Sequence, residues 1–153
     1  AIWHGASQKV GQSAAPLFLD RIDIQCEITP VPFKDISQAA PGEPSATIRE
    51  RVIAARQIQE QRYKDIKGIH CNEQMTERMI HQYAEPDADS VEVLRSAMER
   101  LSLSARAYSR ILKVARTIAD LDGSEKVQLP HIAEAIGYRQ LDRGDWAERG
   151  MYS

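Results

Sequence analysis

Four basic side chains recur at helical spacing in the second half of the chain: Arg106, Arg110, Lys113 and Arg116. At roughly 100° per residue they fall within about 120° of one another around a helix. One interpretation is a solvated face, since the stems of these residues cover apolar surface while their heads stay in water. The other is contact with phosphate groups, because a guanidinium fork matches phosphate oxygens. A helix dipole disfavours a cation in its first turn, which favours a functional role for Arg106.

A fifth cation, Arg21, stands between two acids in the run LDRID at 19–23. The simplest interpretation is a surface arginine paired with a neighbouring carboxylate, a pair that contributes little to stability. From Ile22 to Ile28 apolar and polar residues alternate, a period typical of a strand with one buried face. That pattern predicts Cys26 to be a small core residue.

Cysteine and histidine residues are candidates for metal binding, and cysteines also for disulfide formation. His70, Cys71 and His81 do not match the paired ligand spacing of structural zinc sites, so we expect no metal site. The two cysteines cannot form a disulfide framework, which favours a reducing, cytoplasmic setting.

The elements that position these residues are predicted to be helices. A first helix is expected from a cap at Thr47 to about Lys64, with its apolar stripe formed by Ile48, Val52, Ala55 and Ile58. The caps of the next two helices are expected at Asn72 and at Asp89 or Ser90. The fourth helix, from Ser104 to about Leu121, has an apolar arc of roughly 160°, which predicts packing on more than one side. Pro130 opens a last helix.

The predicted fold is therefore mainly α, a bundle of about five helices preceded by a short strand. The expected organisation is a frayed or vector-derived terminus at 1–18, the strand segment at 19–36, a Pro- and Gly-rich linker at 37–46, the helical domain at 47–143 and a tail at 144–153.

The amino-acid composition excludes several classes of protein. A chain of 153 residues can bury a core, hiding roughly 70% of its unfolded surface. With 20 basic and 22 acidic residues, it is neither a uniformly basic nucleic-acid binder nor an acidic disordered tail. No apolar run approaches the roughly 20 residues of a membrane helix, so we expect no membrane partner. No basic and apolar leader is visible.

Four segments resemble the magnesium chelatase-like AAA+ ATPases, most closely their competence-protein branch. They are DRIDIQ at 20–25, CNEQMT at 71–76, LSARAYSRILKVARTIADL at 103–121 and HIAEAIGYR at 131–139. The resemblance covers about residues 19–143. It implies that 47–143 form the helical lid of a larger ATPase and that 19–36 are the last strand of its nucleotide-binding core.

The resemblance also implies roles for two arginines. Arg106 matches the sensor 2 arginine, which contacts the γ-phosphate, and Arg21 matches an arginine finger, which reaches a nucleotide held by the neighbouring subunit. Cations directed at the transferred phosphoryl group accelerate hydrolysis. ATP and Mg²⁺ would be the cofactors of the full-length protein, and its partners would be the missing N-terminal AAA+ core, five further copies in a homo-hexamer, and DNA. The chelatase branch would instead act in metal insertion into a porphyrin.

The sequence also departs from the family. It holds no G-x-x-x-x-G-K-[ST] loop, so we expect this chain alone to bind no cofactor and to hydrolyse no ATP. Before Arg21, the segment APLFLDR replaces a glycine of the family pattern and adds a residue. The alternative function is a stand-alone helical module that binds nucleic acid or protein through its basic face, with Arg110, Lys113 and Arg116 as contacts.

Overall fold

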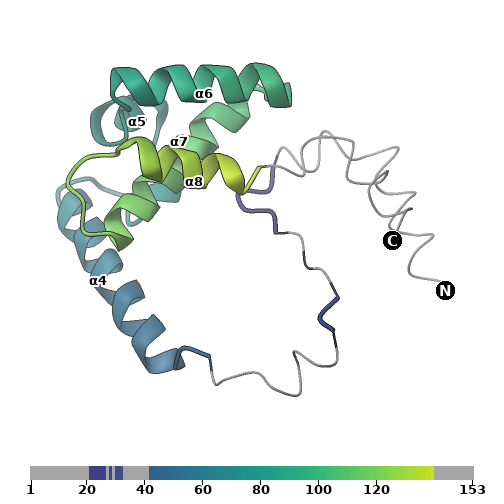
Figure 1. Ribbon diagram of the computed structural model, residues 1–153. Coiled ribbons are helices and arrows are strands. Elements are labelled where there is room, and N and C mark those ends of the chain that lie inside the picture. Colours follow the sequence, from purple (N-terminus) through teal and green to yellow (C-terminus); the bar gives the residue numbers. More distant parts are fainter. Residues whose placement is uncertain (1–20, 27, 29, 33–41, 140–153) are drawn as a thin grey trace.

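The computed structural model describes residues 21–26, 28, 30–32 and 42–139. Five α-helices and one short 3₁₀ helix lie in this part of the chain, and no strand does (Figure 1). They are α4 (Ser45–Tyr63), η1 (Asn72–Gln74), α5 (Glu77–Tyr83), α6 (Ala88–Leu101), α7 (Ala105–Leu121) and α8 (Leu129–Gly137). The prediction of a mainly α fold is confirmed. None of these helices is long and apolar enough to cross a membrane.

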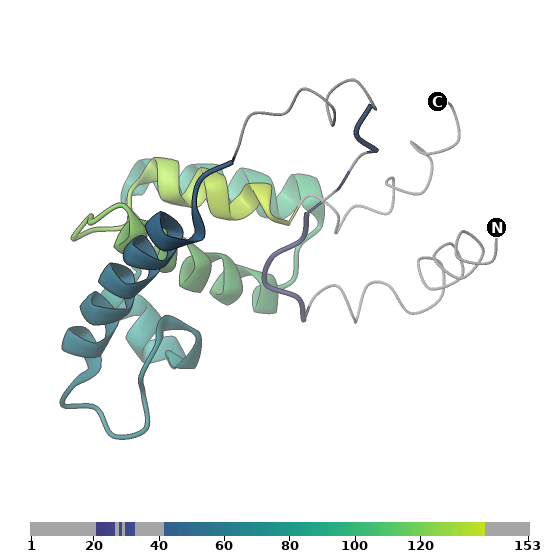
Figure 2. The same cartoon turned by 90° about the horizontal axis from the view of Figure 1, so that it is seen from below.

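Helix α7 is the centre of the bundle, because α4, η1, α5 and α8 all pack against it. Figure 2 shows α8 alongside it. The wide apolar arc predicted for this helix is confirmed: its fully buried apolar residues are Ala107, Ile111, Leu112, Ala115 and Ala119. Burying each of the larger ones contributes about 1.5–3 kcal/mol. A helix packed on several sides holds a firm orientation, which matters for the residues on its remaining face.

The ends of α7 are set by local chemistry. Ser104 is the N-cap, and its hydroxyl accepts a hydrogen bond from the backbone N–H of Ala107 at 3.1 Å. After Leu121, Gly123 takes a φ of 67°, a left-handed conformation that glycine adopts without strain. Both ends lie where the sequence predicts them.

Two other caps differ from the prediction by a few residues. Asp87, not Asp89 or Ser90, caps α6, and its carboxylate accepts from the N–H of Ser90 at 2.8 Å. Thr76, not Asn72, caps α5. Asn72 instead begins η1 and is buried, because its side chain is used in a tertiary network described below.

The predicted apolar stripe of α4 is wrong except at Ala55, which is buried. The helix begins at Ser45, so Thr47 is not its cap, and Ile48, Val52 and Ile58 are exposed. The buried residues are Ala55, Gln59 and Tyr63. The first turns of α4 extend beyond the other helices in Figure 1, so only its second half finds a packing partner among the described residues.

The alternating segment before the linker does not form a strand in its described part. Ile24 is 53% exposed, Ile28 is 89% exposed and Cys26 is exposed, so the prediction of a buried cysteine is wrong. A strand is stabilised by hydrogen bonds to a neighbouring strand, and the described residues include none. The segment is attached instead to the bundle, through a hydrogen bond from the N–H of Gln25 to the carbonyl of Tyr138 at 2.9 Å. Residues 1–18 and 144–153 lie outside the described ranges.

Candidate functional site

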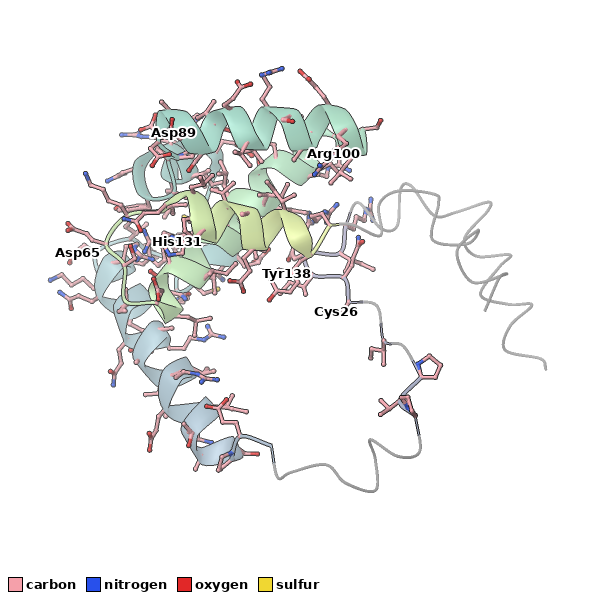
Figure 3. The ribbon with its side chains drawn as sticks, in the orientation of Figure 1. Cys26, Asp65, Asp89, Arg100, His131 and Tyr138 are labelled. Atoms are coloured by element: carbon pink, nitrogen blue, oxygen red, sulfur yellow. The ribbon has the colours of Figure 1, made fainter. Side chains whose placement is uncertain are left out.

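A groove of about 610 Å³ runs along the exposed side of α7. One wall is the segment at 23–26, and the others come from η1, α5 and α8. Figure 3 shows two labelled residues of the wall, Cys26 and Tyr138, close to each other where α8 ends. The lining combines cations, carboxylates and apolar side chains. The cations are Arg106, Arg110 and Lys113, the carboxylates are Asp23, Glu73, Glu77 and Glu134, and the apolar side chains include Ile24, Val114, Ile118 and Leu121. Such a mixed lining suits a ligand or partner that carries both charge and apolar surface.

Arg106 is the second residue of α7 and is exposed. No hydrogen bond or ion pair joins it to any other residue in the described ranges. The first turn of a helix carries unpaired N–H groups and a partial positive charge, so a cation there does not stabilise the helix. Arg106 and these N–H groups together form a positive end that favours an anion.

The next two cations of the predicted basic face are already engaged. Arg110 forms an ion pair with Asp23, and the side chains are 28% and 41% exposed. The ammonium group of Lys113 donates to the backbone carbonyl of Glu73. Beside them, the hydroxyl of Ser109 donates to the Glu77 carboxylate at 2.8 Å.

Arg116 points away from this face into the core and is only 1% exposed. Its guanidinium donates to the Asp120 carboxylate at 2.9 and 3.1 Å and to the carbonyls of Ser124 and Glu125 at 2.7 and 2.9 Å. Burial lowers the pKa of Arg116, and the charge of Asp120 partly offsets this effect. With its donors occupied, Arg116 is not available to a ligand in this arrangement.

Asp120 is the centre of a buried polar network that the sequence interpretation did not include. Arg62 of α4 and Arg116 both donate to its carboxylate, and so does the amide of Asn72 at 2.8 Å. The side-chain oxygen of Asn72 accepts from the Tyr63 hydroxyl at 2.7 Å. Burial raises the pKa of Asp120, but the hydrogen bonds from Arg62 and Asn72 and the charges of Arg62 and Arg116 together outweigh it, so the pKa lies below its usual value.

One part of this network had a signal in the sequence. Arg116 and Asp120 are four residues apart, a spacing at which opposite charges meet on a helix. The contributions of Arg62 and Asn72 come from 58 and 48 residues away, and no local pattern indicates them.

Arg21 is exposed and lies two residues before Asp23, the partner of Arg110. The structure therefore brings the segment that carries Arg21 against the helix that carries Arg106. Within the described ranges, no group of three or more His, Cys, Asp or Glu residues could hold a metal ion. Cys71 is half-buried, and His131 accepts from the N–H of Gln128 at the start of α8.

Fold and groove together define an α-helical domain whose central helix, α7, borders a groove of charged and apolar side chains. The chain belongs to the magnesium chelatase and ComM family: residues 42–139 match the family model described as "Magnesium chelatase, subunit ChlI C-terminal". The match covers α4 to α8 and therefore the whole described bundle.

Individual relatives extend the similarity beyond the bundle. The chain is 41% identical over 127 residues to YifB of Salmonella typhimurium and 39% identical over 127 residues to the competence protein ComM of Haemophilus influenzae. It is 31% identical over 131 residues to Rv2897c of Mycobacterium tuberculosis. These alignments cover 82%, 82% and 86% of the chain and 24%, 24% and 25% of the relatives. The chain thus spans about a quarter of the length of these relatives.

Proposed function

We propose that this domain is the helical lid of a ComM-like AAA+ ATPase, and that Arg106 is its sensor 2 arginine. The observation that carries the proposal is the division of the four cations on α7. Arg110, Lys113 and Arg116 are each engaged within the domain, whereas Arg106 is exposed, with no partner among the described residues. A cation left free at the positive end of a helix is explained by an anion that comes from outside the domain.

A nucleotide triphosphate carries both kinds of surface that Arg106 and the apolar wall of the groove would contact. Arg106 would donate to γ-phosphate oxygens, which its planar guanidinium can contact in a two-pronged geometry. The apolar wall formed by Val114, Ile118 and Leu121 offers surface to a less polar part of a ligand. A volume of about 610 Å³ lies within the usual range for small-molecule sites.

The phosphate-binding loop and the Mg²⁺ ligands would come from the remainder of the full-length protein. The chain has no G-x-x-x-x-G-K-[ST] motif, and its described residues hold no acidic cluster for a cation. Arg21 would act as an arginine finger that reaches the nucleotide of the neighbouring subunit in a homo-hexamer. Its exposure supports that role. The domain alone would then be inactive.

DNA is the substrate that the proposal assigns to the whole protein, which would act in the cytoplasm. The support is the identity of 39% to a relative whose name is competence protein ComM. Overall similarity favours this branch over metal insertion into a porphyrin.

The test is the ATPase rate of the full-length protein with Arg106 replaced. We expect Arg106→Ala to lower kcat at least about tenfold, since a cation on the transferred phosphoryl group stabilises the transition state. Arg100→Ala is the matched control, because Arg100 is an exposed arginine at the end of α6, outside the groove. An unchanged kcat in Arg106→Ala would show that Arg106 is not sensor 2.

A further inference from the structure

The segment that carries Arg21 is held to the bundle by polar contacts. The carboxylate of Asp23 pairs with Arg110, the guanidinium of Arg139 donates to the carbonyl of Ile22, and the N–H of Gln25 donates to the carbonyl of Tyr138. All three contacts fall within four consecutive residues of the segment. Their partners come from α7 and from the two residues that follow α8.

Apolar packing contributes little to this attachment. Ile24, Ile28 and Val31 are 53%, 89% and 57% exposed, so these three side chains do not anchor the segment, and Ile22 is partly buried. Among the described residues, the segment is therefore positioned largely by directional contacts. The ion pair is the one of these three contacts that joins two side chains of opposite charge. Both groups are partly withdrawn from water, which strengthens their attraction compared with a fully exposed pair.

The two members of the ion pair are also close in sequence to the two arginines to which the proposed function gives a phosphate. Arg106 is four residues before Arg110, about one turn or 6 Å along the helix. Arg21 is two residues before Asp23, at most about 7 Å along the chain. A rigid link between Asp23 and Arg110 would make Arg21 and Arg106 move together. Without that link, the two exposed cations would move independently.

We infer that Asp23 and Arg110 are a positioning pair that couples the Arg21 segment to the lid. The pair fixes the position of Arg21 relative to Arg106. Arg21 is directed at the nucleotide of the neighbouring subunit, and Arg106 is directed at the nucleotide of its own subunit. A lid movement at one nucleotide then displaces the arginine at the next, so that successive sites hydrolyse cooperatively. The pair also neutralises Arg110, which leaves Arg106 as the cation that faces the phosphate.

This inference rests on the proposed function and is tested in the full-length protein. The variants are Asp23→Asn, Arg110→Gln and the charge exchange Asp23→Arg with Arg110→Asp. We measure kcat, KM and the Hill coefficient for ATP. Each single variant should lower kcat about ten- to hundredfold, as expected for misplaced groups, and bring the Hill coefficient towards 1, with little change in KM. The charge exchange should restore both to near the parent values.

Two controls separate this role from a structural one. Glu92→Gln breaks an exposed ion pair with Arg95 on α6, far from the groove, and should leave kcat and the Hill coefficient unchanged. The melting temperature of the single variants should stay at the parent value, because neither partner is buried in the core. The inference is overturned if Asp23→Asn and Arg110→Gln keep parental kcat and cooperativity, or if the charge exchange restores neither.

The two proposals can fail separately. If Arg106→Ala inactivates the enzyme while Asp23→Asn has no effect, the sensor role stands and the coupling role is wrong. If Arg106→Ala has full activity, the proposed function itself is wrong.

Discussion

Arg62 and Asp120 lie 58 residues apart in the sequence and form a two-pronged ion pair that joins the end of α4 to the end of α7. One of its hydrogen bonds, from Nη1 to Oδ2, measures 2.8 Å, and the Asp120 side chain is fully buried. Since α4 buries few apolar residues, this polar contact has a large part in fixing the helix to the bundle. It fixes α4 to the bundle at the end of α7 opposite to Arg106.

Replacing Asp120 should therefore destabilise the domain strongly. Asp120→Ala leaves Arg62 and Arg116 without their shared carboxylate, and removing one partner of a buried pair typically costs about 3–5 kcal/mol. The measurement is urea unfolding of this chain, followed by circular dichroism. The matched control is Glu99→Ala, which removes an exposed partner of Arg95 and should have little effect. Equal stability of the two variants would show that the network does not hold α4.

Acid should weaken the same network. The pKa of Asp120 is lower in the folded chain than its ordinary value of 3.8, mainly through the hydrogen bonds from Arg62 and Asn72. A group with a depressed folded pKa contributes stability that is fully present above its unfolded pKa and is lost as the pH falls through the folded one. The free energy of unfolding should thus fall below about pH 3.8. In Asp120→Asn this decrease should be smaller; an identical pH profile would contradict the assignment.

The sequence predicted best the elements whose signals are local. Helix α7 has a serine cap, a strong apolar period and a glycine just beyond its end, and the structure places it within one residue of the predicted bounds. Local spacing could not separate Arg106 from Arg116, because both fall within the same arc of a helical projection. Only tertiary packing, which turns Arg116 towards Asp120 and the loop after α7, makes one exposed and the other buried.

Three of the wrong predictions concern apolar side chains that the described residues do not bury. Ile48 and Val52 of α4 and Ile24 of the preceding segment have the periods of buried faces, but all three are exposed. Periodicity shows that a face is suited to burial and does not identify what covers it. The exposure of these apolar side chains agrees with the fact that the chain spans about a quarter of the length of its relatives.

The cap of α7 should contribute measurably to stability. Ser104→Ala removes the hydrogen bond to the N–H of Ala107 and should cost about 1 kcal/mol. Urea unfolding measures the loss. Ser96→Ala is the control, because Ser96 is exposed within α6 and alanine is the better helix former, so its stability should be unchanged or slightly higher. If both variants behave alike, the cap does not hold the first turn in which Arg106 lies.

Binding of single-stranded DNA by this chain distinguishes the lid from the alternative of a stand-alone basic module. If Arg106 is the α7 cation that is free to contact phosphate, affinity should be weak, and Arg106→Gln should reduce the slope of log K against log salt by about 0.7, the value for one neutralised phosphate. Arg110→Gln should then leave the slope unchanged, because Arg110 is already paired with Asp23. Fluorescence anisotropy with a labelled oligonucleotide measures this slope, with Arg106→Gln and Arg110→Gln as matched variants. A steep slope that both variants reduce would favour the basic module, because it would mean that DNA competes successfully with Asp23 for Arg110.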